Sequence, residues 1–212
     1  MKHDDWLNLV QQNKAIAVIR APSFLIGEKI AKSVAAAGMK LIEITWDSDR
    51  PAELISHLRQ ELSDCTIGTG TILAVSELKN AIAAGAEFVF TPQTNFDLIA
   101  IALNRSVPII PGALTPTEIM TAWNAGASSV KVFPIQCVGG VSYLQNLRAP
   151  LGHIPMIPTG GITLENAREF ISAGAIAVGL SGSLFPKTVI EHEDWNEIQH
   201  QAETLLRTLK SI

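Results

Sequence analysis

A lysine stands in the middle of an apolar run of the chain. Lys131 lies between Val130 and Val132 in a segment, residues 128–134, that otherwise has the composition of a buried strand. Burial disfavours the ammonium form, lowers the pKa of a lysine, and leaves a neutral amine that can attack a ketone. Two structural roles compete with this one: an ion pair, or a stem that lies along a wall while the amine reaches solvent. The chemistry that the residue suggests is Schiff-base formation.

A glutamate is embedded in a second apolar run, residues 41–46. Glu43 could serve only to neutralise a neighbouring base, Lys131 among them. A carboxylate beside an amine nucleophile can also relay protons while the carbinolamine forms, and can then act as a general base. The two roles are compatible, and we expect Glu43 to lie close to Lys131.

Two glycine-rich loops follow the last two apolar runs. Thr159-Gly160-Gly161-Ile162-Thr163 leads into a predicted helix at 164–173 with Thr163 as its N-cap, and Ser181-Gly182-Ser183 follows the next run. Unpaired backbone N–H groups at a helix N-terminus bind phosphate, and hydroxyl groups add donors. Glycines that only make tight turns are the alternative for each loop. Two such loops together predict a phosphate site.

A repeated Ala-Gly motif marks the boundaries of the helices and strands that must position these residues. It ends an amphipathic stretch and precedes an apolar run at Gly38, Gly85, Gly126 and Gly174, so each glycine marks a helix-to-strand joint. Short apolar runs predict strands at 15–19, 41–46, 66–72, 87–92, 107–111, 129–134, 155–159 and 176–180. Helical patterns alternate with them at 23–37, 51–62, 76–84, 96–105, 115–124, 141–148 and 163–173.

This alternation requires parallel strands joined by right-handed crossovers. Eight such units close most naturally into a (β/α)8 TIM barrel, which we expect to be one domain over residues 1–212. Extra helices at 4–13 and 194–209 would cover the bottom of the barrel or pack on its side. An open doubly wound sheet is the alternative, but no glycine-rich dinucleotide fingerprint follows the first strand. A barrel gathers its chemistry at the carboxyl ends of its strands.

Composition narrows the class of protein. The 212 residues are 47% hydrophobic and 17% charged, as in a globular protein, and a net charge of -4 with dispersed Lys and Arg argues against a nucleic-acid partner. The acidic segment at residues 1–6 is unlike a secretory signal, and no apolar run reaches the ~18 residues of a membrane span. Two cysteines outside any Cys-x-x-Cys motif suit a reducing cytoplasm, although a single disulfide stays open. The five histidines lack paired spacing, so we expect neither a metal site nor a cofactor.

Several segments, taken together, resemble the 2-keto-3-deoxy-6-phosphogluconate (KDPG) and 4-hydroxy-2-oxoglutarate (KHG) aldolases, which are class I lyases. The segment at 41–45 is similar to the family's Leu-Glu-Val-Thr, and Gly68-Thr69-Gly70-Thr71 is similar to its Gly-Ala-Gly-Thr. Ile110-Pro111-Gly112, the lysine strand at 130–134 and the loop at 158–162 match its proline-glycine turn, Schiff-base strand and phosphate loop. The resemblance covers nearly the whole chain.

The resemblance implies a homotrimeric barrel that reversibly splits KDPG into pyruvate and glyceraldehyde 3-phosphate without a metal, and that also splits KHG into pyruvate and glyoxylate. The small-molecule partner is then a phosphorylated keto acid. Lys131 would form the Schiff base and Glu43 would move the protons. The implied binding residues are Arg20 and Thr71 for the carboxylate, Gly160, Gly161, Gly182 and Ser183 for the phosphate, and Thr45, Pro92, Phe133 and Thr159 for the pocket wall.

The chain departs from the family at two places. Asp47 stands where the family usually has a carboxylate-binding arginine, and an aspartate there would repel a carboxylate. Arg20 is the expected replacement and Arg50 a second candidate, while a surface cation is the alternative role for Arg20. After Phe133-Pro134 the chain has Ile135-Gln136 in place of the common Ala-Glu, so the pocket wall differs.

Three alternative functions stay open. Related phosphogalactonate aldolases also lack the arginine, so 2-keto-3-deoxy-6-phosphogalactonate is a second possible substrate. Thr159 favours the gluconate branch, because the other branch tends to valine there. A barrel that binds a phosphorylated ligand without catalysis is the non-enzymatic alternative, with Asp47 as the damaging change. A metal-dependent pyruvate aldolase is the third.

Overall fold

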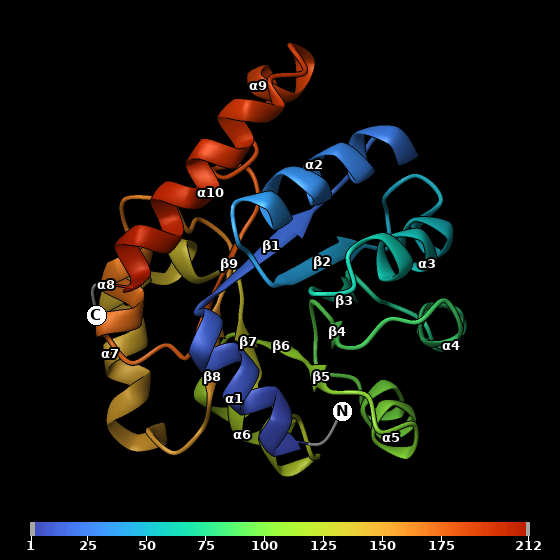
Figure 1. Ribbon diagram of the computed structural model, residues 1–212. Helices are drawn as coiled ribbons and strands as arrows, with labels where there is room; N and C mark the ends of the chain where they lie inside the picture. The colour runs from blue at the N-terminus through green and yellow to red at the C-terminus, as the bar shows by residue number, and fades with distance from the viewer. Residues whose placement is uncertain (1–2, 211–212) are drawn as a thin grey trace.

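The chain forms a curled parallel sheet surrounded by helices in a computed structural model that describes residues 3–210 (Figure 1). Residues 1–2 and 211–212, the two ends of the expected 1–212 domain, lie outside the described residues. Residues 1–2 are also the start of the acidic amino-terminal segment. The strands are β1 (Ala15–Ile19), β2 (Leu41–Thr45), β3 (Thr66–Gly70), β4 (Val89–Phe90), β5 (Ile109–Ile110), β6 (Gly112–Ala113), β7 (Val130–Val132), β8 (Met156–Pro158) and β9 (Val178–Leu180).

The sheet closes into a barrel in two arcs. One arc has the strand order β5-β4-β3-β2-β1-β9 and the other the order β6-β7-β8, and every pairing within them is parallel. Only Pro111 separates β5 from β6, because proline lacks the N–H that a ladder needs. A bridge between Thr159 and Gly179 joins β8 to β9 at the other seam. With β5 and β6 counted as one interrupted strand, the predicted (β/α)8 barrel is confirmed, and the open doubly wound alternative is wrong.

Helices cover the outside of the barrel. They are α2 (Phe24–Ala36), α3 (Pro51–Glu61), α4 (Val75–Ala83), α5 (Phe96–Asn104), α6 (Pro116–Asn124), α7 (Gly140–Leu151) and α8 (Ala167–Ser172). The four repeated glycines have φ angles of 99°, 96°, 99° and 98°, a left-handed conformation that closes the helix before each strand. The helix-to-strand joints are therefore where the repeated Ala-Gly motif predicted them.

Two short elements were not predicted, and one predicted helix begins late. The 3-10 helix η1 (Ile135–Val138) follows the lysine strand, and α9 (Lys187–Glu191) precedes the last helix. The prediction of a helix from residue 164 was wrong, since α8 begins at Ala167. Thr163 and Asn166 bond to each other instead: Thr163 N donates to Asn166 Oδ1 at 2.8 Å, and Asn166 N donates to Thr163 Oγ1 at 3.2 Å. This reciprocal pair has the pattern of a capping box, and Ala167 N donates to Thr163 O at 3.1 Å, so residues 163–166 form a turn that leads directly into the helix.

The two terminal helices occupy both of the predicted places. α1 (His3–Asn13) closes the amino-terminal end of the barrel, with Trp6 and Val10 fully buried against residues that point inside it. The Trp6 ring lies 5.1 Å from that of Phe88, and its Nε1 donates to Ser129 Oγ at 3.1 Å. α10 (Trp195–Lys210) packs outside, against α2 and α8 (Figure 1).

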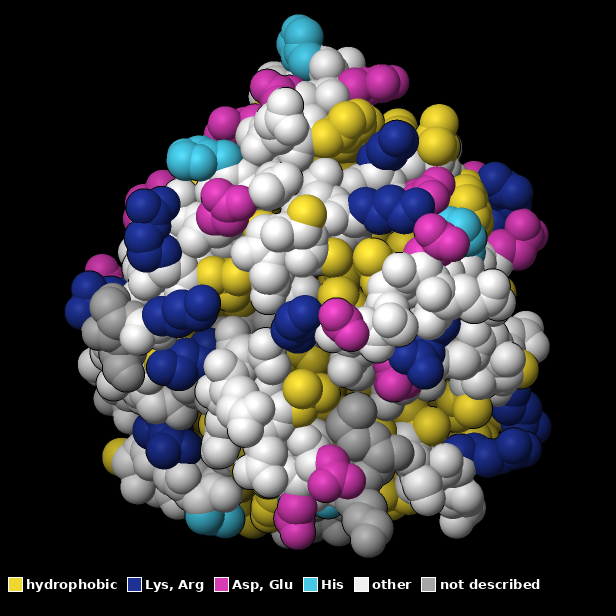
Figure 2. Space-filling model, viewed as in Figure 1, with side chains coloured by type: hydrophobic (Ala, Val, Ile, Leu, Met, Phe, Trp, Pro, Cys, Tyr) yellow, Lys and Arg dark blue, Asp and Glu magenta, His cyan; other side chains and the backbone are white. Residues whose placement is uncertain are grey.

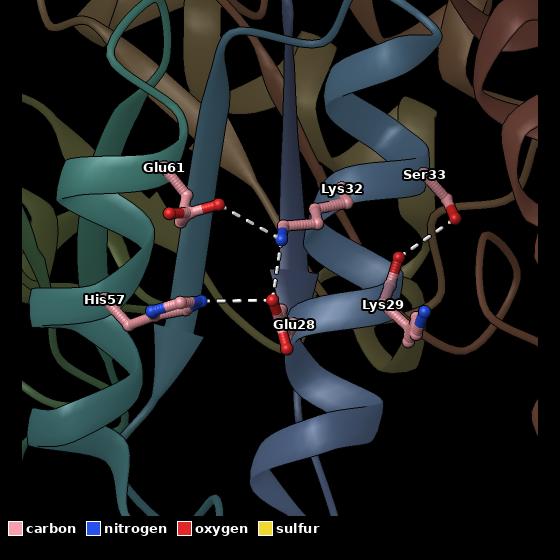
Figure 3. Close-up of polar contacts among 6 residues, drawn as sticks. All are labelled: Glu28, Lys29, Lys32, Ser33, His57 and Glu61. Carbon is pink, nitrogen blue, oxygen red and sulfur yellow. Dashed lines mark hydrogen bonds and ion pairs between the residues drawn. The ribbon is translucent and has the colours of Figure 1, made fainter.

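Polar side chains join α2 to α3 on the outer surface (Figure 3). Lys32 Nζ donates to Glu28 Oε1 at 2.6 Å and to Glu61 Oε2 at 3.3 Å, while His57 Nε2 lies 3.0 Å from Glu28 Oε1. Hydrogen bonds from Lys32 and His57 hold the pKa of Glu28 below its usual value. Solvent screens exposed pairs of this kind, so the cluster adds little to the stability of the fold.

The surface shows no concentration of one charge on the face in view. Lys and Arg side chains are scattered among Asp and Glu over that face (Figure 2). Among residues 3–210, no helix has both the length and the apolar composition needed to cross a membrane.

Candidate active site

A cavity of about 480 Å³ lies where the carboxyl ends of the strands meet. Every predicted site residue lines it: Arg20, Glu43, Thr45, Thr71, Pro92, Lys131, Phe133, Thr159, Gly160, Gly161, Gly182 and Ser183. The wall also contains Val18, Ile162, Thr163, Gly179 and Ser181. The structure thus brings together residues that lie on, or just after, seven of the strands. The roles assigned to them stay predictions.

Lys131 lies on β7 with 6% of its surface exposed, between Gly112 of β6 and Ile157 of β8 in the ladder. Its Nζ is 4.6 Å from the centre of the Phe133 ring and has neither a hydrogen bond nor an ion pair among the described residues. Burial lowers the pKa of Lys131, the Glu43 charge opposes this shift, and the Arg20 charge adds to it. Neither structural role considered for the lysine applies, because the amine is neither paired nor out in solvent.

Glu43 faces the same cavity from β2 and is 2% exposed. Its Oε1 is buried without a hydrogen-bond partner, a costly state for a carboxylate oxygen that points to a role toward a ligand. Burial raises the pKa of Glu43, while Lys131 and Arg20 act to lower it. A purely neutralising ion pair with Lys131 is wrong, since no such pair forms within residues 3–210.

The glycines of β3 make room for this carboxylate. Gly70 pairs with Thr45 in the register of β2 and β3, and a Cβ built on Gly70 would overlap the Glu43 carboxylate. A Cβ on Gly68 would instead overlap the Phe88 ring in the barrel interior. Gly70 therefore leaves the space that the Glu43 carboxylate occupies.

Two threonines of the cavity are held in unusual states. Thr71 has a φ of 61°, in the left-handed region that β-branched residues rarely adopt. Thr159 Oγ1 is buried without a hydrogen-bond partner. Backbone strain and unpaired buried polar atoms concentrate at functional sites, so both observations favour contact with a ligand here.

Asp47 corrects an expectation from the sequence. Arg20 Nε donates to Asp47 Oδ2 at 2.7 Å, so the aspartate is paired rather than facing the cavity as an isolated negative charge. Burial opposes the shift, but the hydrogen bond from Thr45 and the charge of Arg20 hold the pKa of Asp47 below its usual value. Arg50 is the wrong second candidate, because it bonds to Glu53 and lies over the Phe24 ring, away from the cavity.

The two glycine-rich loops lie against each other. Gly160 and Gly161 have φ angles of 87° and 86°, and a Cβ on Gly161 would overlap the Gln136 side chain. Leu164 N donates to Ser183 Oγ at 3.3 Å, which ties the first loop to the second. Gln136 therefore supports the loop, and its backbone N also donates to Gly160 O at 3.1 Å.

Sequence reasoning missed several lining residues that strand periodicity could have found. Val18 precedes Arg20 by two positions, and Gly179 precedes Ser181 by two, so each pair points to one side of its strand. No three His, Cys, Asp or Glu side chains are grouped as metal ligands in the described part of the chain. Both cysteines are free thiols, which closes the question of a disulfide between Cys65 and Cys137.

Comparison with known proteins identifies similar sequences and similar folds. A family model described as KDPG and KHG aldolase matches residues 7–201. The 2-dehydro-3-deoxy-phosphogluconate aldolase of Haemophilus influenzae is 34% identical over 85% of this chain and 85% of its own, and that of Treponema pallidum is 33% identical over 84% and 85%. A solved structure described as native KDPGal superposes with a TM-score of 0.85 at 27% identity, covering 93% of this chain and 94% of that one.

Proposed function

Because the chain belongs to the KDPG and KHG aldolase family, we propose that it is a class I aldolase that reversibly cleaves KDPG to pyruvate and glyceraldehyde 3-phosphate. Family membership makes it a carbon–carbon lyase, and the substrate is the part proposed. The observation that carries the proposal is the presence in one cavity of a buried Lys131, which has no hydrogen bond or ion pair among the described residues, and a Glu43 whose Oε1 has no hydrogen-bond partner.

The first step is condensation of Lys131 with the substrate. The neutral Nζ attacks the C2 ketone, and the carbinolamine loses water to give a protonated imine. Burial supports this step because it lowers the pKa of Lys131 and so increases the fraction of free amine. Glu43 shuttles the proton that the addition and the loss of water require.

The second step breaks the C3–C4 bond. The electron pair of that bond moves into the protonated imine and forms an enamine, while the C4 hydroxyl gives its proton to Glu43 and becomes the aldehyde of glyceraldehyde 3-phosphate. Glu43 then returns a proton to C3, and water hydrolyses the pyruvate imine. The raised pKa of Glu43 suits a group that must both take up and release a proton.

The two anionic ends of the substrate need separate partners. We assign the carboxylate to Arg20 and Thr71, and the phosphate to Gly160, Gly161, Gly182 and Ser183. Backbone N–H groups of glycine loops are suited to phosphate, and the guanidinium of Arg20 to either anion. Binding at the remote phosphate would orient the reacting centre.

Other substrates have specific support. The likeness at 27% identity to a protein described as KDPGal favours 2-keto-3-deoxy-6-phosphogalactonate as a second candidate. A 28% identical relative in Escherichia coli is described as KHG/KDPG aldolase, which favours cleavage of KHG as well. The non-enzymatic barrel loses its main support, since Arg20 compensates Asp47. From the family we also infer a homotrimer, and from the free cysteines a cytoplasmic enzyme.

Borohydride trapping tests the proposal. Reduction in the presence of pyruvate should add one pyruvate-derived group to Lys131, detected by intact and peptide mass spectrometry. The variant Lys131→Met should trap nothing, whereas Lys40→Ala, a control at a lysine outside the cavity, should trap normally. Trapping that persists in Lys131→Met would refute a Schiff base at this residue.

Substrate choice is tested by a coupled pyruvate-release assay. KDPG, its galactonate epimer and KHG are compared with the unphosphorylated 2-keto-3-deoxy acid, with and without prior chelation. We expect the highest kcat/KM with KDPG and no loss on chelation. Equal kcat/KM with and without the phosphate group would overturn the phosphate site, and loss on chelation would favour the metal-dependent alternative.

A further inference from the structure

Arg20 and Asp47 form a pair at the rim of the cavity, and the two members face it differently. Arg20 is part of the cavity wall, whereas Asp47 is not. They come from the loops after β1 and β2, and their side chains are 55% and 48% exposed. Asp47 is therefore placed to hold Arg20, which faces the ligand.

The atom that Asp47 holds decides which edge of the guanidinium remains for a ligand. Arg20 Nε donates to Asp47 Oδ2 at 2.7 Å. Within the described residues, the Arg20 side chain makes no other hydrogen bond to the protein. A guanidinium presents its five N–H groups in a rigid planar fork. With Nε engaged, the edge formed by the two terminal amino groups is the one that can bind a carboxylate or phosphate in a bidentate way.

The loop around Asp47 is fixed by several further bonds. Ser48 Oγ accepts from Ala21 N at 3.0 Å, and Asp49 N donates to Ala21 O at 3.0 Å, so the loops after β1 and β2 are tied directly. Thr45 Oγ1 lies 3.3 Å from Ser48 Oγ. Asp47 is thus carried on a braced segment, and it limits the directions that Arg20 can take.

We propose that Asp47 is a positioning residue, which holds Arg20 by Nε so that its terminal amino edge binds one anionic group of the substrate. This inference rests on the proposed function for the identity of that substrate. The anion is a carboxylate or a phosphate, because β1 lies between β2, which carries Glu43, and β9, which leads into the Ser181-Gly182-Ser183 loop. When Asp47 already holds Arg20 in place, less conformational entropy is lost on binding, so more of the free energy of the charge-assisted bond from Arg20 to the anion contributes to affinity.

Electrostatic repulsion between Asp47 and the substrate would change KM in the opposite direction from positioning. If Asp47 acted mainly by repelling the substrate anion, removing its charge would strengthen binding and lower KM. If Asp47 positions Arg20, removing it raises KM, because Arg20 must then be ordered at the moment of binding. The direction of the change in KM therefore distinguishes the two.

Steady-state kinetics with KDPG provides the first test. We expect Asp47→Ala to raise KM roughly 10-fold, the scale of one charge-assisted hydrogen bond, with kcat little changed. Asp47→Asn keeps an acceptor for Nε, so its KM should rise less than that of Asp47→Ala. Asp49→Asn, a matched control on the same loop whose Oδ2 accepts from Phe24 N, should leave KM unchanged. A lowered or unchanged KM in Asp47→Ala overturns the proposal.

A double-variant cycle separates positioning from a general effect on the loop. In the Arg20→Ala background, Asp47→Ala should cause no further rise in KM, because the side chain that it positions is gone. Losses that simply add would show that Asp47 acts independently of Arg20, and would overturn the proposal. Equal thermal midpoints among the variants are expected, since both side chains are about half exposed.

Binding without turnover keeps this inference separate from the proposed function. Calorimetric titration of Lys131→Met and of Lys131→Met/Asp47→Ala with pyruvate, and separately with inorganic phosphate, measures anion binding without imine formation. Weaker binding of pyruvate places the carboxylate at Arg20, and weaker binding of phosphate places the phosphate there; either supports the proposal. Unchanged binding of both anions overturns it. Failure of borohydride trapping in the wild type would instead count against the Schiff-base function alone.

Discussion

Lys131 and Glu43 are tuned by their neighbours in opposite directions. Desolvation lowers the pKa of the amine and raises that of the carboxyl, which brings both toward neutral pH. The Glu43 charge raises the pKa of Lys131, and the Arg20 charge lowers it. Glu43 and Arg20, the two charged neighbours of Lys131, should therefore have effects of opposite sign on the pH at which the lysine reacts.

We predict opposite shifts in the pH dependence of imine formation. The amine must be neutral to attack, so trapping at saturating pyruvate increases as pH rises through the pKa of Lys131. Glu43→Gln removes a negative charge, lowers that pKa and moves the rise to lower pH, whereas Arg20→Gln moves it to higher pH. The initial rate of borohydride-trapped adduct measured against pH is the test. Shifts of the same sign would contradict this account of the electrostatics.

At the level of elements, the pairing of β2 with β3 sets the position of the catalytic carboxylate. Gly70 and Gly68 both face inward from β3, but one borders Glu43 and the other borders Phe88. The first neighbour is the end of a flexible side chain beside a cavity, and the second is a ring that is fully buried beside Trp6. The same substitution should therefore have different consequences at the two glycines.

We predict that Gly70→Ala mainly lowers kcat and that Gly68→Ala mainly lowers stability. A methyl group at Gly70 displaces the Glu43 carboxylate, and loss of a positioned general base costs about 10²-fold or more. A methyl group at Gly68 overpacks the Phe88 site, which destabilises by roughly 1–3 kcal/mol. Urea denaturation and the coupled assay on each variant give both quantities. A Gly70→Ala enzyme with normal kcat would show that Glu43 is not held by β3.

Whether a feature depends on local sequence or on contacts between distant segments explains how much of it the sequence could predict. The order of strands and helices and the four Ala-Gly joints follow from local patterns and were predicted, whereas several bounds differ: β4 spans Val89–Phe90 where 87–92 was predicted. The bond from Arg20 to Asp47 joins residues from different loops, and the fit of Gln136 against Gly161 likewise depends on distant segments meeting. The regular part of α8 begins at Ala167, after a turn that the mutual bonds of Thr163 and Asn166 stabilise.

Across the whole molecule, two apolar clusters account for most of the buried side chains. One fills the space between strands and helices, and the other fills the barrel interior beneath the cavity and includes Trp6 of α1. Among the described residues, Glu43 and Lys131 are the charged side chains that are buried. Buried groups without partners cost folding free energy, so the active site is where this fold gives up stability.

We predict that the double variant Lys131→Met/Glu43→Gln is inactive but more stable than the wild type. Stability of the wild type falls as pH rises from 4.5 through the raised pKa of Glu43, and it recovers as pH rises from the lowered pKa of Lys131 to 10.5. The gain from removing both charges is therefore largest between these two ranges, near neutral pH, at roughly 1–3 kcal/mol. Urea denaturation of both proteins across pH measures it. A double variant that is less stable than the wild type at neutral pH would mean that the two groups compensate each other in the folded state, and that catalysis here carries no cost in stability.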